Sequence, residues 1–254
     1  MRAQVRTADD IPTVGAALRR GHPTNRGLKP LLPVVFFIAG LLSVAHAQEV
    51  QQHGLVFEEW VRATFFNGYK PPGYTQKWDI PAAINREHGG LPVNPKAAKY
   101  RSPVDLGDAL RQFDTDEPFI LIIGYWVQEG DAKRMVNIVA PVITPATMRK
   151  LWGGITREDL VRLDALIKDR SLDYREARKQ AQAMKKSRPF NTSLITLNPK
   201  IDSKGQRRLQ CSLSFSKVFK YLAPGADDGV QDPPVLWGVP FTETIASRPR
   251  RFEN

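Results

Sequence analysis

The apolar run Phe119–Val127, FILIIGYWV, limits the fold of this chain more than any other feature. It contains no charged residue and is rich in the β-branched and aromatic side chains that favour strands. Because apolar and polar residues do not alternate along it, both faces of such a strand are expected to be covered. The run therefore predicts the central strand of a sheet that lies between other layers, as in α/β and α+β domains.

The segments on either side of this run alternate between helical and strand patterns. Residues 54–67 place apolar side chains at helical spacing, and the prolines and glycine of residues 70–73 end this predicted helix. Further strands are expected at Tyr74–Ile80, Leu91–Lys96, Met135–Ala140, Ser193–Leu197 and Arg208–Phe215, and further helices at Val104–Phe113 and within Thr144–Lys186. Within the last of these segments, Thr156 and Asp159 have the spacing of a helix-capping pair.

The first 47 residues differ in character from the rest of the chain. Residues 1–29 are polar and basic, residues 31–45 are apolar, and Ala45-His46-Ala47 follows. This order is typical of a signal peptide over residues 1–47 and predicts a secreted or periplasmic protein with no integral membrane association after cleavage. The alternative is an uncleaved membrane anchor, although fifteen residues fall short of the roughly twenty that a spanning helix needs.

The remaining chain is expected to form one α/β domain over residues 48–222. No internal repeat interrupts it, and its size allows a substantial core. Residues 223–254 are rich in proline, glycine and arginine and are expected to be an irregular tail.

Composition narrows the classes of function. The formal net charge of +11 favours anionic partners such as nucleic acid or a membrane surface. The single cysteine, Cys211, excludes an intramolecular disulfide and a zinc site built on clustered cysteines. The chain contains no G-x-S-x-G, G-x-G-x-x-G or Walker A motif, so serine-hydrolase and nucleotide-cofactor chemistry have no positive signal.

Acidic residues and one lysine follow a defined order between residues 54 and 111. The predicted helix carries Glu58, the next predicted strand ends near Asp79, the following one contains Asn94 and Lys96, and a predicted helix then carries Asp108. Carboxylates that meet at the ends of neighbouring strands can bind Mg²⁺, which prefers oxygen ligands. A nearby lysine would suit a site that cuts phosphodiester bonds, because hydrolysis places negative charge on the phosphate.

This order resembles the PD-(D/E)XK nuclease superfamily, over roughly residues 54–140. The resemblance implies a restriction-endonuclease-like fold, which is a mixed sheet flanked by helices in a single domain. It also implies Mg²⁺-dependent endonuclease activity. DNA is expected as the partner in preference to RNA, and the resemblance leaves open whether the protein forms a homodimer. Glu58 would be the helix carboxylate, Asp79 the first metal ligand and Lys96 the catalytic lysine.

Asn94 departs from the family pattern, which has Asp or Glu at this position. An asparagine offers a carbonyl oxygen to a metal ion but no charge. Some members of the superfamily move this carboxylate to the next helix, and Asp108, twelve residues after Lys96, is suitably placed for that role. Asp105 would share its helical face. We therefore expect Asp79, Asp108 and Asn94 as the metal ligands.

A second set of basic residues lies far from this constellation in the sequence. Between the two last predicted strands, four basic residues are expected to lie in a hairpin and to contact a phosphate backbone: Lys200, Lys204, Arg207 and Arg208.

Two other functions remain open. A catalytically inactive relative could keep the fold and bind a polyanion, and Asn94 favours that reading. A secreted structural or partner-binding protein, in which the order of acidic residues is coincidental, is the other alternative, and the predicted export signal favours it.

Overall fold

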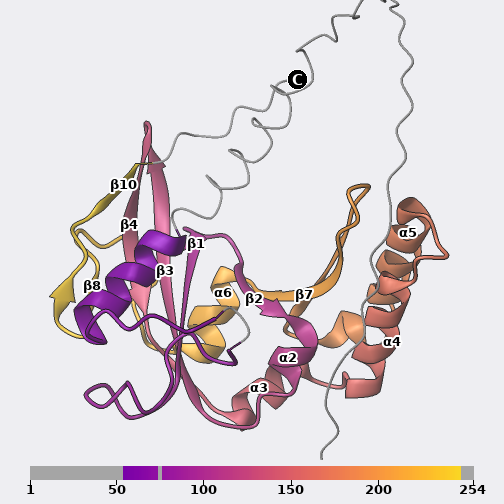
Figure 1. The fold of residues 1–254 in the computed structure, drawn as a ribbon, viewed down its shortest axis with the longest axis horizontal. Helices are drawn as coiled ribbons and strands as arrows, with labels where there is room; N and C mark the ends of the chain where they lie inside the picture. The colour runs from indigo at the N-terminus through magenta and orange to yellow at the C-terminus, as the bar shows by residue number, and fades with distance from the viewer. Residues whose placement is uncertain (1–53, 74–75, 247–254) are drawn as a thin grey trace, which may run out of the picture. The chain divides into compact units, whose positions relative to one another are not determined.

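This computed structural model describes residues 54–73 and 76–246. Its larger sheet has the order β1-β3-β4-β10, and β5 pairs with one end of β3. Strand β1 runs parallel to β3, whereas β4 and β5 run antiparallel to β3, and β10 runs antiparallel to β4 (Figure 1). The strands are β1 (Val93–Lys99), β3 (Phe119–Glu129), β4 (Ala132–Val139), β5 (Val142–Ile143) and β10 (Thr244–Ala246).

Strand β3 is the central strand that the apolar run predicts. It lies between β1 and β4, and its side chains divide between two hydrophobic cores on opposite faces of the sheet. Ile120 and Ile122 lie in one core, whereas Leu121 and Ile123 lie in the other. The prediction of a strand covered on both faces is confirmed.

A smaller antiparallel sheet has the order β2-β7-β6. Its strands are β2 (Val104–Asp108), β6 (Thr196–Ile201) and β7 (Arg207–Leu213). The helix α4 packs against β6 and β7, and α5 packs against β6 (Figure 1). The helices after the first are α2 (Ala109–Phe113), α3 (Pro145–Trp152), α4 (Arg157–Lys168), α5 (Tyr174–Lys185), α6 (Phe215–Lys217) and the short turns η2 (Phe190–Thr192) and η3 (Val218–Leu222).

The three helices within residues 144–186 confirm the helical pattern there. The helix α4 begins at the expected capping pair, because the Thr156 hydroxyl oxygen accepts from the Asp159 backbone N–H at 3.2 Å. The Asp159 carboxylate in turn accepts from the Thr156 backbone N–H at 3.0 Å. This reciprocal arrangement satisfies backbone donors that the first turn of a helix leaves unpaired.

The first described helix covers residues 54–65 and packs on the larger sheet. Its Phe57 ring lies against Gly124 in the middle of β3, where an added Cβ would come within 2.7 Å of Phe57 Cζ. Glycine at this position therefore allows the helix to approach the sheet closely. The helix confirms the amphipathic pattern of residues 54–67.

Two expected elements differ from the structure. Residues 76–79 form no strand, and Ile80 alone makes an isolated antiparallel bridge to Val93. The segment 104–113 is a strand followed by a short helix rather than one helix. In this segment, the chain bulges between Asp105 and Gly107, which has a φ of 91°, and Asp108 then caps α2.

The segment after residue 222 contains strands where an irregular tail was expected. The strands β8 (Val235–Leu236) and β9 (Val239–Pro240) pair with each other, and β10 joins the larger sheet. Leu236, Phe241 and Ile245 pack in the core beneath the first helix. These apolar residues lie in short segments that prolines and glycines interrupt, so they form no periodic pattern from which the sequence could reveal them.

The described residues thus form a mixed α/β fold in which a mixed sheet is flanked by helices. The predicted signal peptide, residues 1–47, lies outside the described residues. Among the described residues, no helix is both long and apolar enough to cross a membrane.

Candidate active site

Lys96 and Asp79 form the centre of the candidate site. The Lys96 Nζ donates to Asp79 Oδ2 at 3.2 Å, and both side chains are partly exposed. Lys96 lies in β1, and Asp79 comes directly before the residue that bridges to β1, Ile80. The bridge between Ile80 and Val93 therefore holds Asp79 beside the strand that carries the lysine.

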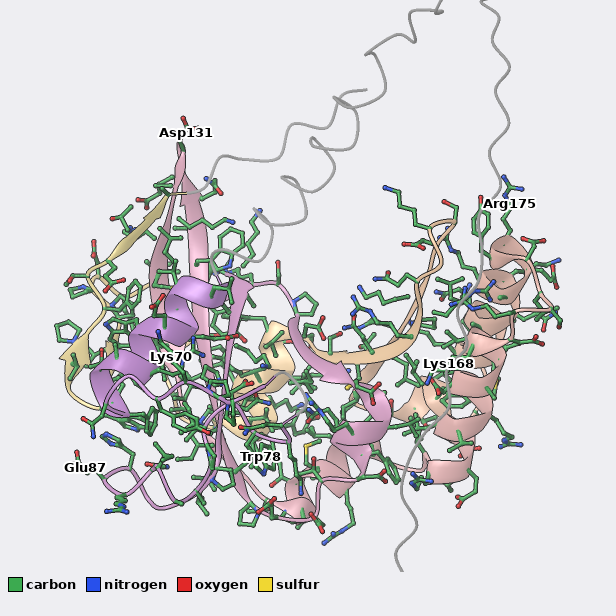
Figure 2. The ribbon with its side chains drawn as sticks, in the orientation of Figure 1. Lys70, Trp78, Glu87, Asp131, Lys168 and Arg175 are labelled. Atoms are coloured by element: carbon green, nitrogen blue, oxygen red, sulfur yellow. The ribbon has the colours of Figure 1, made fainter. Side chains whose placement is uncertain are left out.

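The segment that carries Asp79 is fixed by its neighbour Trp78, which is labelled in Figure 2. The Trp78 indole N–H donates to Glu117 Oε1 at 2.8 Å, and its ring packs against Phe119 with the ring centroids 4.7 Å apart. Because Phe119 begins β3, this contact ties the segment to the same sheet as Lys96.

Glu58 reaches the same site from the first helix. Its side chain is 24% exposed, and no hydrogen bond to its carboxylate occurs among the described residues. Burial raises the pKa of Glu58 above its ordinary value, and the negative charge of Asp79 also raises it, whereas the positive charges of Lys96 and Arg62 lower it. The pKa of Glu58 therefore responds to the same lysine and aspartate that form the ion pair.

The packing of the first helix sets the position of Glu58 along β1. Phe57 precedes Glu58 and contacts Gly124, which is the register partner of Ala97 across β1 and β3. Ala97 is in turn the neighbour of Lys96 in β1. The contact between Phe57 and Gly124 thus fixes the position of Glu58 along the strand that carries the lysine. Glu59, on another side of the helix, is exposed.

Asn94 lies in a different environment from the one expected. It is 4% exposed and lines a small interior cavity with Gln112 and apolar side chains such as Leu121 and Met148. It makes no hydrogen bond to Asp79 or Lys96. The structure therefore does not join Asn94 to this pair by a hydrogen bond. Asn94 and Lys96 are two residues apart and share a face of β1, but Asn94 is buried in the core whereas Lys96 is partly exposed.

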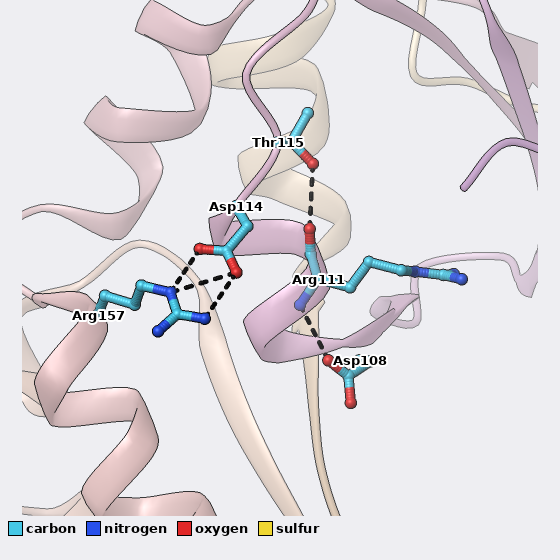
Figure 3. A network of polar contacts seen from close by, with 5 residues as sticks. All are labelled: Asp108, Arg111, Asp114, Thr115 and Arg157. Carbon is cyan, nitrogen blue, oxygen red and sulfur yellow. Dashed lines mark hydrogen bonds and ion pairs between the residues drawn. The ribbon is translucent and has the colours of Figure 1, made fainter. Parts of the chain in front are cut away.

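Asp108 caps a helix and does not take part in the candidate site. It is exposed at the end of β2 in the smaller sheet, and its Oδ1 accepts from the Arg111 backbone N–H at 2.9 Å, which caps α2 (Figure 3). Asp105 likewise accepts from the Gly107 backbone N–H at 2.8 Å. Neither carboxylate makes a contact with Asp79, Glu58 or Lys96 in the described part of the chain.

Magnesium could be held here by a minimal set of ligands. Among residues 54–73 and 76–246, no three histidine, cysteine, aspartate or glutamate side chains are grouped so that they could hold a metal ion. The charge of Asp79 nevertheless acts on Glu58, and Mg²⁺ is usually bound through one or two carboxylates together with water and substrate phosphate. The residues present fit such an ion, without Asn94 and Asp108.

The basic residues of the hairpin differ in their surroundings, because one has a structural role and the others are exposed or partly exposed. The Arg207 guanidinium donates to the carbonyl oxygens of Ile167, Asp169 and Leu172 at 2.9–3.1 Å, in and just after the last turn of α4. This side chain therefore ties the hairpin to α4, which differs from its expected role in binding a phosphate. Lys204 and Arg208 are exposed, Lys200 is partly exposed, and the hairpin tip covers residues 202–206.

Arg62 is a member of the site that was not predicted. Its Nη1 lies 3.8 Å from Glu58 Oε2, one helical turn away. The only signal in the sequence is the spacing of four residues between the two, which places them on the same helical face. The described site therefore contains two carboxylates and two cations, from the first helix, the segment before Ile80 and β1.

Similarity to known proteins gives no independent assignment of these residues. Comparison of the chain with protein-family models, with curated proteins and with solved structures found no match. The geometry and charge of the site are therefore the observations that bear on function.

Proposed function

We propose that this protein binds nucleic acid and hydrolyses phosphodiester bonds at Lys96, Asp79 and Glu58, as a divergent PD-(D/E)XK nuclease. The observation that carries this proposal is the ion pair of 3.2 Å between Lys96 and Asp79, with Glu58 in the same electrostatic environment. The three residues come from a helix, a segment bridged to β1, and β1 itself. Their order along the chain is the one on which the resemblance rests, although Asp79 precedes an isolated bridge and does not end a strand.

The chemistry needs few groups. In hydrolysis the oxygen of a water molecule forms a bond to phosphorus, and the bond from phosphorus to the leaving ester oxygen breaks. One proton of the water passes to a base, and the leaving oxygen takes up a proton. Lys96 can donate a hydrogen bond from Nζ to a phosphate oxygen, because its ammonium is partly exposed, and Asp79 holds that ammonium in place.

Glu58 in its ionised form can accept the proton of the attacking water at a carboxylate oxygen. A raised pKa makes a carboxylate a stronger base, so the burial of this side chain suits that role. Asp79 and Glu58 would hold Mg²⁺, which when bound neutralises charge on the phosphate and lowers the pKa of a coordinated water.

Binding of the nucleic-acid backbone would also use cations outside the candidate site. Lys204 and Arg208 project from the hairpin, and Lys200 is partly exposed beside them. Such cations give affinity that is independent of sequence and decreases as salt increases. The net charge of +11 favours the same class of partner.

One observation favours a second candidate, a protein that binds a polyanion without cutting it. Asn94 lines an interior cavity and Asp108 caps α2, so neither supplies the carboxylate that the family has beside its lysine. Two carboxylates, one of which is paired with Lys96, give a weaker metal site than three would.

The test combines cleavage and binding by the full chain. Plasmid DNA, single-stranded DNA and RNA are incubated with Mg²⁺ or with a chelator, and binding is measured by fluorescence anisotropy over a range of salt concentrations. We expect cleavage that requires Mg²⁺ and disappears in Lys96→Met but persists in Lys99→Met, a change at an exposed lysine of the same strand. Salt-sensitive binding without cleavage supports the second candidate, and absence of both contradicts the proposal.

A further inference from the structure

Arg62 has an uncommon environment for a mostly buried arginine. Its side chain is only 18% exposed, yet its guanidinium makes no hydrogen bond among the described residues. The ion pair with Glu58 spans 3.8 Å, which is too long for a hydrogen bond. The five N–H donors of its fixed planar group therefore have no hydrogen-bond acceptor in residues 54–73 and 76–246.

Other arginines of this protein show what a structural role looks like. Arg207 donates to three backbone carbonyl oxygens, and Arg134 donates from Nε to Glu129 Oε1 at 2.8 Å. Both side chains are also only partly exposed. Arg62 differs from them because its donors remain available although its charge lies in the candidate site.

We propose that Arg62 binds an anionic phosphate of the substrate at this site, together with Lys96. This inference rests on the proposed function for the identity of the substrate as a nucleic acid. A guanidinium binds phosphate through two parallel N–H donors, which a carboxylate at 3.8 Å does not occupy. An incoming phosphate can thus bind Arg62 without first breaking a hydrogen bond to any residue that the structure describes.

Glu58 places the two cations in one site. Its carboxyl group is influenced by both Arg62 and Lys96, so both positive charges lie close to the same side chain. Lys96 is held by Asp79, whereas Arg62 is held loosely. Glu58 is therefore the group that competes with the phosphate for Arg62, and removal of its charge should strengthen phosphate binding.

The alternative is that Arg62 only balances the charge of Glu58. Binding of inorganic phosphate to the full chain separates the two ideas, because it requires neither cleavage nor a metal ion. The affinity of every variant is measured by isothermal titration calorimetry, with chloride at matched ionic strength as the reference. In the unaltered protein and in the variants that keep Arg62, the NMR resonance of the Arg62 Nε–H group reports whether phosphate binds at this side chain. The variants are Arg62→Gln, Arg62→Lys and Glu58→Gln. Controls are Arg86→Gln, which removes a charge from an exposed loop, and Glu59→Gln, which removes one from the exposed side of the same helix.

We expect phosphate to shift the Arg62 resonance and Arg62→Gln to weaken binding about tenfold or more, since a charged hydrogen-bonded pair is lost. Arg62→Lys should bind with intermediate affinity, because a lysine keeps the charge but lacks the planar pair of donors. Glu58→Gln should bind phosphate more tightly, and both controls should resemble the unaltered protein. An Arg62 resonance that does not respond to phosphate, or unchanged binding in Arg62→Gln, overturns the proposal.

Cleavage kinetics keep this inference separate from the proposed function. If the protein cuts nucleic acid, Arg62→Gln should raise KM, because a contact to the substrate phosphate is lost. An arginine that only balances the charge of Glu58 would change kcat and its pH dependence and leave KM in place. If the protein does not cut but phosphate shifts the Arg62 resonance, the anion site stands and the nuclease function fails. If it cuts and Arg62→Gln has an unchanged KM, the nuclease function stands and the role of Arg62 fails.

Discussion

The ring of Phe57 occupies the space that a side chain at position 124 would need, with Phe57 Cζ 2.7 Å from the place of a Cβ on Gly124. This contact lies between the helix that carries Glu58 and the strand next to β1. A glycine in the middle of the most apolar strand is therefore part of the geometry of the candidate site, although it carries no chemistry of its own.

We expect Gly124→Ala to destabilise the protein by about 1–3 kcal/mol, because the methyl group forces the Phe57 ring and its helix away from the sheet. The same movement should reduce cleavage by displacing Glu58. Chemical denaturation and the cleavage rate measure the two effects. Gly154→Ala is the matched control, because the nearest atom to its added Cβ lies 4.0 Å away. Equal stability of the two variants would contradict the close contact.

The raised pKa of Glu58 predicts how its removal changes stability with pH. A carboxyl whose pKa is higher in the folded state destabilises the fold once pH rises above its ordinary value of 4.5, and this penalty is complete above the folded pKa. Glu58→Gln removes the penalty, so the variant should have the higher free energy of unfolding at pH 7, and the difference should shrink toward pH 4.5. Urea denaturation at several pH values measures this. Glu59→Gln should show no such trend, and a loss of stability at pH 7 in Glu58→Gln would mean that its ion pairs outweigh the cost of burial.

The position of Asp108 predicts a structural effect without a catalytic one. Asp108→Ala removes the cap of α2 and should cost about 1 kcal/mol of stability. Cleavage, where it is present, should continue, because Asp108 contacts none of Glu58, Asp79 and Lys96 among the described residues. Asp108→Asn, which can still accept the hydrogen bond, should recover most of the stability. Loss of cleavage in both variants with folding intact would restore Asp108 as a metal ligand.

Two neighbouring arginines should behave differently when each is replaced. Arg207→Ala loses three hydrogen bonds to carbonyl oxygens at the end of α4 and should lower the free energy of unfolding by about 1–3 kcal/mol. Arg208→Ala should leave stability nearly unchanged but weaken nucleic-acid binding, with the salt dependence reduced by about one ion. Thermal unfolding and anisotropy titrations measure both. The reverse pattern would assign the phosphate contact to Arg207.

The sequence predicted the parts of this fold that have a regular pattern. Phe119–Val127, the first helix and the capping pair of Thr156 and Asp159 follow from periodicity and local chemistry, which act within a few residues. Strand β2 was not predicted, because residues 104–113 change from strand to helix at the bulge near Gly107 without a change in composition. Strand β10 was missed because the residues around Ile245 have no strand pattern of their own. Its place in the fold is set by the core into which Ile245 packs.

The same distinction applies to the candidate site. The order of Glu58, Asp79 and Lys96 indicated that the three could meet, but their meeting depends on the bridge between Ile80 and Val93, which no local pattern shows. Arg207 had the charge of a phosphate contact, and only the carbonyl oxygens around it reveal a structural role. Asn94 is buried while Lys96, two residues later on the same face of β1, is partly exposed, and this difference depends likewise on the tertiary packing around the strand.

The core beneath the first helix is completed by Leu236, Phe241 and Ile245, from the far end of the chain. Phe241 lies 4.8 Å from the ring of Trp60 in that helix, centroid to centroid. During synthesis the beginning of a domain leaves the ribosome before its end. The helix that carries Glu58 and Arg62 therefore lacks part of its packing until residues 236–245 have been translated. A nascent chain that stopped before residue 235 would contain every residue of the candidate site. It would still lack the side chains against which the helix of Glu58 and Arg62 packs.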